Sequence, residues 1–154
     1  METTEEIYPM PAFPVLNVTD LAASSRWYQE ALGFRNVFTM AGPGGVPLLV
    51  HLRWVKYADV LLAARPVPPG PRGLGIVLSF SAYLSGRSVD EIAAQAAAYG
   101  ATIVAPPEPK PWNTRECTIA DPDGFQLTFT EPVNMHRSFD EVIQEAAKAE
   151  VGER

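Results

Sequence analysis

The order of predicted secondary structure in this chain, a strand, a helix and then several strands, occurs twice. In the first half the hydrophobic pattern predicts a helix at about 20–32 and strands at about 12–18, 35–40, 47–54 and 57–63. In the second half it predicts a helix at about 88–99 and strands at about 74–80, 102–105, 114–120 and 125–130. A repeated order of this kind indicates a duplicated α+β unit, with 65–73 as the linker between the halves.

Both predicted helices carry start and stop signals. Asp20 is a good N-cap for the first helix, and Gly33 is expected to end it in the left-handed conformation that glycine tolerates. Gly100 should end the second helix in the same way. Two sets of residues are expected to share a helical face: Leu21, Ser24, Tyr28 and Leu32 in the first helix, and Val89, Ile92, Ala96 and Tyr99 in the second. A third helix at about 138–149 has an apolar face of Phe139, Val142, Ile143 and Ala146.

Composition narrows the range of partners. With 154 residues and a net charge of −6, the chain lacks the basic stripe that nucleic-acid binding requires. No apolar run approaches the roughly 18 residues of a membrane span, and no signal peptide is recognised, so a cytoplasmic location is expected. The single cysteine, Cys117, excludes an internal disulfide and is expected to be a buried thiol in a strand.

Two segments resemble those of a known superfamily. They are Asn17-Val-Thr-Asp-Leu-Ala-Ala-Ser-Ser-Arg-Trp-Tyr-Gln-Glu-Ala-Leu-Gly-Phe34 and Trp112-Asn-Thr-Arg-Glu-Cys-Thr-Ile-Ala-Asp-Pro-Asp-Gly-Phe-Gln-Leu-Thr-Phe129, and together they resemble the vicinal oxygen chelate superfamily of glyoxalases, ring-cleaving dioxygenases and bleomycin resistance proteins. The resemblance implies paired βαβββ modules, about 12–64 and 74–131, in a domain-swapped homodimer. Residues 1–11 would be an N-terminal arm and 132–154 a helical tail.

The resemblance also locates the positions that hold a metal in metal-using members. Carried over by motif, they are Phe13, Leu61, Gly75 and Thr128, the last lying four residues after Gly124. An aromatic ring, an isobutyl group and a hydrogen cannot donate electrons to a divalent cation, and one threonine hydroxyl is a poor ligand alone. Neither a metal nor another cofactor is therefore expected. The two histidines, His51 and His136, are interpreted as a structural or pocket residue and an exposed loop residue.

Without a metal, the cup between the modules is expected to bind an aromatic molecule. Trp112 lies in a segment that resembles the Pro-Trp-Gly-x-Arg-Glu segment bordering the cleft in bleomycin-resistance-like members, with Asn113 replacing the glycine. Trp54 is expected at a rim with an exposed indole, and strand alternation puts polar side chains in the cup. The full set of predicted ligand-binding residues is Trp112, Trp54, Phe38, Phe13, Asn17, Asp59, Leu61, Ser79, Asn113, Glu116, Thr118 and Thr128.

The preferred hypothesis is stoichiometric sequestration of a planar aromatic drug or natural product, as in the bleomycin-resistance-like branch, with no catalytic residues. One alternative is an enzyme, a lyase, isomerase or dioxygenase, that uses a misaligned metal site or takes Glu116 or Asp59 as a general base. Another is an interaction module whose partner binds the outer helices. The sequence does not identify the ligand.

Overall fold

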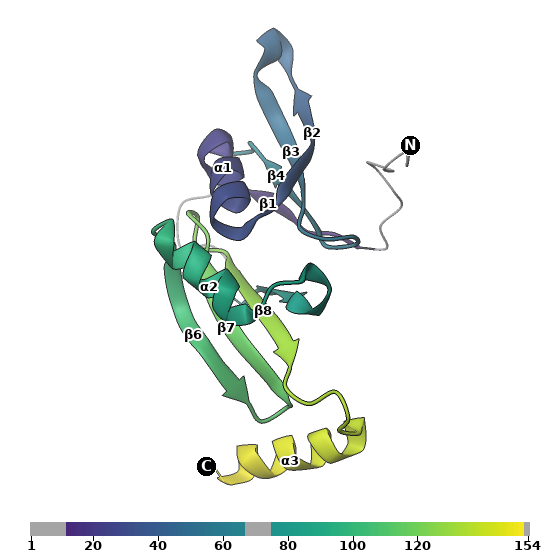
Figure 1. Ribbon diagram of the computed structural model, residues 1–154. Helices are drawn as coiled ribbons and strands as arrows, with labels where there is room; N and C mark the ends of the chain where they lie inside the picture. The colour runs from purple at the N-terminus through teal and green to yellow at the C-terminus, as the bar shows by residue number, and fades with distance from the viewer. Residues whose placement is uncertain (1–11, 67–74, 153–154) are drawn as a thin grey trace, which may run out of the picture. The chain divides into compact units, whose positions relative to one another are not determined.

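A computed structural model describes residues 12–66 and 75–152, which group into two compact units (Figure 1). The first unit contains the described residues up to Gly75 together with Asp121–Phe125. The second contains Ile76–Ala120 and the chain from Gln126 onward. The predicted N-terminal arm and most of the predicted linker lie outside the described residues.

The first unit follows the predicted βαβββ order. Its elements are β1 (Val15–Asn17), α1 (Leu21–Leu32), β2 (Arg35–Ala41), the short 3-10 helix η1 (Pro43–Gly45), β3 (Pro47–Arg53) and β4 (Asp59–Ala63). The sheet order is β1-β4-β3-β2, with β1 parallel to β4 and the other pairs antiparallel. Figure 1 shows the β2–β3 hairpin extending beyond the rest of this sheet.

Helix α1 begins and ends where its sequence signals predict. The Asp20 carboxylate accepts the Ala23 N–H at 2.9 Å, and Gly33 ends the helix at φ 80°. The predicted face is buried: Tyr28 and Leu32 are fully inaccessible and pack on the side of the sheet that carries Leu52, Val60 and Leu62. The opposite side of this sheet, which α1 does not cover, is called the first open face below.

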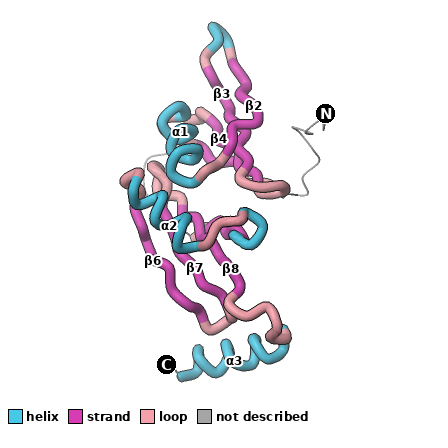
Figure 2. The backbone as a smooth tube through the Cα atoms, viewed as in Figure 1, coloured by secondary structure: helices cyan, strands magenta, loops and turns pink. Residues whose placement is uncertain are grey.

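The second unit repeats the order. Its elements are β5 (Val77–Ser81), η2 (Ala82–Ser85), α2 (Val89–Ala98), β6 (Thr102–Lys110), β7 (Thr114–Ala120), β8 (Gln126–Pro132) and α3 (Phe139–Gly152). The sheet order is β5-β8-β7-β6, with β5 parallel to β8. Figure 2 shows α2 lying over one face of the strands, and the other face is called the second open face. The α+β class and the βαβββ order of both halves are therefore confirmed.

A capping box fixes the start of α2, because Ser88 and Glu91 each accept the backbone N–H of the other. Its buried residues, Val89, Ile92 and Ala96, cover the side of the sheet that carries Ile119, Leu127 and Phe129. Cys117 is on the same side and is 1% exposed, so the prediction of a buried thiol is confirmed. Tyr99, which was predicted to share the face of Val89, Ile92 and Ala96, is the C-cap residue and is 41% exposed.

Strand β6 is longer than the sequence predicts, because it runs to Lys110 instead of ending near residue 105. Pro106, Pro107 and Pro109 argue against a strand by propensity. β6 is an edge strand, however, and its register with β7 shifts between Ile103 and Ala105 and again before Glu108. The proline-rich part is therefore accommodated at a sheet edge, where missing donors cost little.

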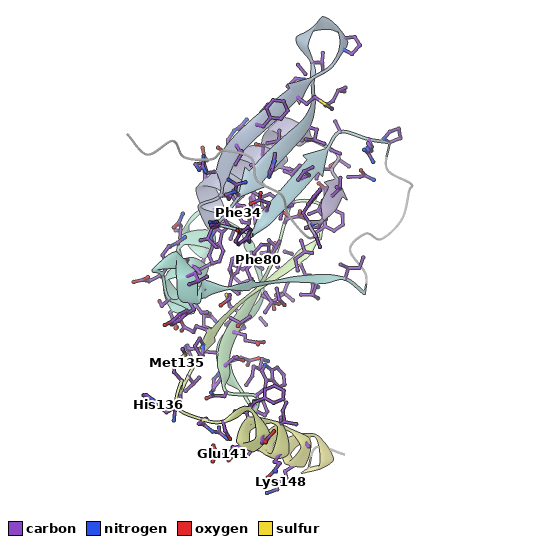
Figure 3. The ribbon with its side chains drawn as sticks, turned by 90° about the vertical axis from the view of Figure 1, so that its right-hand side faces the viewer. Phe34, Phe80, Met135, His136, Glu141 and Lys148 are labelled. Atoms are coloured by element: carbon purple, nitrogen blue, oxygen red, sulfur yellow. The ribbon has the colours of Figure 1, made fainter. Side chains whose placement is uncertain are left out.

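The terminal helix α3 follows the predicted position. Ser138 and Glu141 cap its start by exchanging hydrogen bonds between side chain and backbone. Figure 3 shows Met135 and His136 in the segment before the helix, and Glu141 and Lys148 on the helix itself. Its apolar residues Phe139 and Ile143 are 77% and 47% exposed. None of the described helices is long and apolar enough to cross a membrane.

Candidate functional site

The first open face is mostly apolar. Cross-strand pairing puts Phe38 of β2 and Leu61 of β4 on either side of His51 of β3, and Leu61 beside Val15 of β1. Cα partners in neighbouring strands share a face, so these four side chains form one row across the sheet. The next row is Met40, Leu49, Ala63 and Asn17. Phe38, Met40 and Val15 are 49%, 43% and 43% exposed, so this face offers apolar surface to a ligand.

A buried polar cluster interrupts this apolar surface. Asp59 accepts hydrogen bonds from Arg53 Nε and Nη2, both at 2.8 Å, and lies 2.6 Å from His51 Nε2. The side chains of Asp59 and Arg53 are 0% and 6% exposed, and that of His51 is 16% exposed. Burial raises the pKa of Asp59, but the hydrogen bonds from Arg53 and His51 outweigh it and hold the pKa below its ordinary value. Asp59 is therefore an ionised acceptor in this cluster.

Sequence reasoning included Asp59 in the site but missed Arg53. The two lie opposite each other because the register pairs Arg53 with Asp59 across the short connection between β3 and β4. The only sequence signal was an Arg and an Asp at the ends of two adjacent predicted strands. His51 was interpreted as a structural or pocket residue, and it lies on the first open face.

Asn17 is the second polar residue of the first open face. Its Oδ1 atom is buried and has no hydrogen-bond partner within residues 12–66 and 75–152. A buried amide oxygen without a donor is costly, because it has lost its hydrogen bonds to water. The Asn17 oxygen is therefore an unsatisfied acceptor below the surface of this face, and a molecule bound on the face does not reach it in this structure.

The second open face is polar, as strand alternation predicted. Thr118 pairs with Thr128 across β7 and β8, and their hydroxyls are 2.8 Å apart. Ser79 of β5 pairs with Thr128 from the other side, and Glu116 pairs with Thr130. The structure thus brings Ser79, Thr118 and Thr128 together in one row, with Glu116 further along the same face.

Trp112 lies in the turn between β6 and β7 and is 43% exposed. Its indole Nε1 donates to Glu116 Oε1 at 2.9 Å, and the Thr114 hydroxyl donates to the same oxygen at 2.9 Å. The bond to Glu116 restricts the orientation of the ring without covering its faces. An exposed indole held in this way is suited to stacking on an aromatic ligand.

Asn113 holds the turn together. It adopts φ 67°, the left-handed conformation that asparagine tolerates better than most residues and that the glycine of the related segment would also accept. Its Nδ2 donates to the Asn134 carbonyl at 2.7 Å, and its Oδ1 accepts the Asn134 N–H at 3.1 Å. Both polar atoms of the amide are thus engaged within the chain, where the sequence had suggested ligand binding.

Trp54 differs from its expected position. The strand ends at Arg53 and a turn begins, in which the Trp54 N–H bonds the Ala58 carbonyl. The indole Nε1 donates to the Leu32 carbonyl at 3.1 Å, and the ring lies 6.4 Å from that of Phe34. The indole was expected to be exposed at a rim, and instead it is partly buried against the end of α1.

The positions that would hold a metal do not offer a ligand set. Leu61 is hydrocarbon, Gly75 has no side chain, and the Thr128 hydroxyl is bonded to Thr118. Phe13 is 47% exposed and offers only a ring. Within the part of the chain that the structure describes, no three His, Cys, Asp or Glu side chains group as metal ligands would. These residues do not fit the divalent metal of the resembling enzymes.

A hollow of about 580 Å³ lies on the other side of the first sheet, between α1 and the β2–β3 hairpin. Its polar lining residues Gln29 and Asn36 donate to Ser25 and Thr39, close to themselves in sequence. It contains none of the predicted ligand-binding residues. This hollow is therefore separate from the predicted ligand-binding residues.

Comparison with known proteins agrees with this fold. The solved structure of TioX from Micromonospora sp. ML1 is 22% identical, with a TM-score of 0.61 over 82% of this chain and 98% of TioX. A glyoxalase-related enzyme from Fulvimarina pelagi is 20% identical, with a TM-score of 0.62 over 85% of this chain and 96% of that chain. UcmS2 is 15% identical, with a TM-score of 0.61 over 80% of this chain and 98% of that chain.

Likeness at this level of identity shows the fold alone. A search of curated protein sequences gave no match. The sequence model of one family, however, matches residues 11–129, which is most of the chain. The chain therefore belongs to the Glyoxalase/Bleomycin resistance protein/Dioxygenase superfamily.

Proposed function

We propose that this protein binds a planar aromatic drug or natural product and sequesters it without converting it. The observation that carries the proposal is the set of side chains at the metal positions of the family, Phe13, Leu61, Gly75 and Thr128. Without a Lewis acid, polarisation of a substrate would depend on protein groups alone. Bleomycin resistance proteins, named in the family description, supply the precedent for a binding role.

Each unit, taken by itself, offers contacts that suit such a ligand. On the first open face, the exposed side chains of Phe38, Met40 and Val15 offer apolar contact. In the second unit, the exposed indole of Trp112 offers stacking. The hydroxyl row of Ser79, Thr118 and Thr128 can fix orientation through hydrogen bonds. We further propose a homodimer, as the family resemblance implies, which sedimentation at twice the chain mass of 16.8 kDa would support.

The groups weighed as general bases support binding better than turnover. Both oxygens of Asp59 already accept hydrogen bonds from Arg53, and one of them lies against His51. Glu116 Oε1 already accepts two hydrogen bonds. Asp59 is thus fully engaged with Arg53 and His51, whereas Glu116 Oε2 accepts no hydrogen bond within the described chain and can accept one from a bound donor.

The test is a titration of the purified full chain with a panel of planar aromatic antibiotics, in which tryptophan fluorescence is recorded after each addition. Each ligand is then recovered and weighed by mass spectrometry. Saturable quenching with one ligand per site and an unchanged ligand mass is expected. A changed mass after overnight incubation would mean that the protein is an enzyme. No saturation with any member of the panel would count against an aromatic ligand.

A further inference from the structure

The Nδ1 atom of His51 is a hydrogen-bonding atom of the first open face that has no partner within the described chain. The ring approaches Asp59 through the other nitrogen, Nε2, at 2.6 Å. A carboxylate that already accepts two bonds from Arg53 is ionised and can only accept, so Nε2 must carry a hydrogen. In the neutral ring the hydrogen is then on Nε2, and Nδ1 has a free lone pair.

No group in the described chain donates a hydrogen bond to this lone pair. The contact with Asp59 is the one hydrogen bond of the His51 side chain among residues 12–66 and 75–152. Its neighbours across the strands are Phe38 and Leu61, which cannot donate a hydrogen bond. Nδ1 therefore stands as an isolated acceptor within apolar surface, and a donor placed there would be sheltered from water.

The cluster beneath the ring fixes which nitrogen faces the ligand. Arg53 holds Asp59 through two parallel bonds, and Asp59 holds Nε2, so neither the tautomer nor the orientation of the imidazole is left free. Because the Arg53 and Asp59 charges are opposite and paired, the neutral imidazole adds a dipole and no net charge. This arrangement favours a neutral donor over an anionic group, which would face a lone pair.

The other polar residue of this face has the same preference. Asn17 Oδ1 is buried without a partner in the described chain, and it too is an acceptor. Asn17 belongs to the row next to that of His51 and is two strands away from it. From the spacing of strands and residues, the two backbones are roughly 12 Å apart. The Asn17 oxygen is buried, so it is His51 Nδ1 to which a ligand on this face can donate.

We propose that the first open face recognises an aromatic ligand carrying a hydroxyl or amine donor, which donates a hydrogen bond to His51 Nδ1. This inference rests on the proposed function, since it names the ligand chemistry for the same binding role. Here His51 is a binding residue, and Asp59 and Arg53 are positioning residues that act through it. The ligand thus needs a ring system and a polar hydrogen on or next to it.

The test uses two probes that share one ring system, 2-naphthol and 2-methoxynaphthalene, in the second of which a methyl group replaces the donor hydrogen. With the full chain labelled with ¹⁵N-histidine, the free protein should show the His51 hydrogen on Nε2, the nitrogen that faces Asp59, and none on Nδ1. Added 2-naphthol should shift the His51 Nδ1 resonance and leave that of exposed His136 unchanged. The methoxy probe should bind more weakly and leave Nδ1 unshifted.

The variants separate the hydrogen bond from the fold. His51→Gln can keep an N–H toward Asp59 while removing the second ring nitrogen, so affinity for 2-naphthol should fall by roughly fivefold and affinity for 2-methoxynaphthalene should not change. His136→Gln is the matched control and should alter neither. Thermal melting of each variant confirms that it is folded.

The outcomes are distinguishable. Equal losses for both probes in His51→Gln, or a free protein with the hydrogen on Nδ1, would overturn the inference and leave aromatic binding intact. Failure of both probes to bind, with the Nε2 tautomer confirmed in the free protein, would instead overturn the proposed function and this inference with it.

Discussion

At the scale of single residues, Trp112 combines an exposed ring with a fixed orientation, since its Nε1 is bonded to Glu116. Trp112→Ala should weaken binding of a stacking aromatic ligand by about 1 kcal/mol, the typical contribution of an aromatic pair beyond its buried area. Trp112→Phe keeps a ring and should lose less. Titration of both variants checks this, and an unchanged affinity in a folded Trp112→Ala protein would remove the ring from the site.

A second residue-scale prediction concerns a hydrogen bond that lies far from the open faces. The buried Tyr28 hydroxyl donates to Asp121 Oδ2 at 2.8 Å, and Asp121 Oδ1 accepts the N–H groups of Asp123 and Phe125. Tyr28→Phe should lower the free energy of unfolding by about 1–3 kcal/mol, because one carboxylate oxygen is left buried without a donor. Urea denaturation measures this.

Tyr83→Phe is the matched control for that experiment. Tyr83 is 61% exposed, so Tyr83→Phe removes a hydroxyl that is already solvated. The free energy of unfolding should therefore stay within about 0.5 kcal/mol of that of the wild type. If the two variants lost equal stability, the Tyr28–Asp121 bond would not be the cause.

The residues of the site were only partly predictable. The row of Thr118 and Thr128 followed from strand alternation, since both strands have the predicted bounds within two residues. The Arg53–Asp59–His51 cluster did not, because its geometry depends on the register between β3 and β4. Trp54 was misplaced because the strand ends one residue earlier than expected and the ring follows the turn.

At the scale of elements, the β6–β7 turn is joined to the chain that leaves β8. The Asn113 side chain binds Asn134 at both of its polar atoms, whereas the Asn113 backbone carbonyl accepts the Val133 N–H at 3.0 Å. Asn113→Gly preserves the positive φ and the backbone bond but removes the side chain. We expect amide exchange to become faster at Asn134 and to stay unchanged at Val133.

Hydrogen exchange followed by NMR resolves the two amides. Asn113→Ala adds backbone strain to the same loss of side-chain bonds, so it should also destabilise the unit, by about 1 kcal/mol. Faster exchange at both amides in Asn113→Gly would show that the turn conformation itself, and not the amide bridge, holds this segment.

The elements themselves were largely readable from sequence, since their signals are local. Asp20, Gly33, and the Ser88 and Glu91 pair act within one helical turn, and both helices have the expected positions. The extension of β6 through three prolines was not readable, because its pairing with β7 comes from tertiary context and overrides propensity. The hydrogen bond between Tyr28 and Asp121 joins residues 93 positions apart, so no local sequence pattern predicts it.

At the scale of the whole molecule, two buried groups make stability fall at alkaline pH. Burial raises the pKa of Cys117 to about 11 and that of Tyr28 well above its ordinary value. A raised folded-state pKa means that this stability is present below the unfolded-state pKa and lost as pH rises toward the folded value. For Cys117 the loss falls between about pH 9 and 11 and amounts to up to about 2 kcal/mol.

Urea unfolding under reducing conditions at pH 8 and pH 10.5 tests this for wild type and Cys117→Ala. The variant starts lower because the truncation leaves a small cavity, but it should lose less stability between the two pH values. Any decline that remains in the variant includes the contribution of Tyr28. Equal declines in the two proteins would show that the thiol does not titrate in this way.

The two halves of the chain repeat the same βαβββ order but are not exchangeable. The turn Asp121–Phe125 belongs by its contacts to the first unit, where Asp121 binds Tyr28 and Asp123 binds Thr19 and Ser24. A gene fragment ending before Gly75 would therefore encode an incomplete first unit. A second half made alone would contain the turn Asp121–Phe125 without the residues of the first unit that bind it. A split or circularly rearranged version of the protein would need to carry this turn along with the first half.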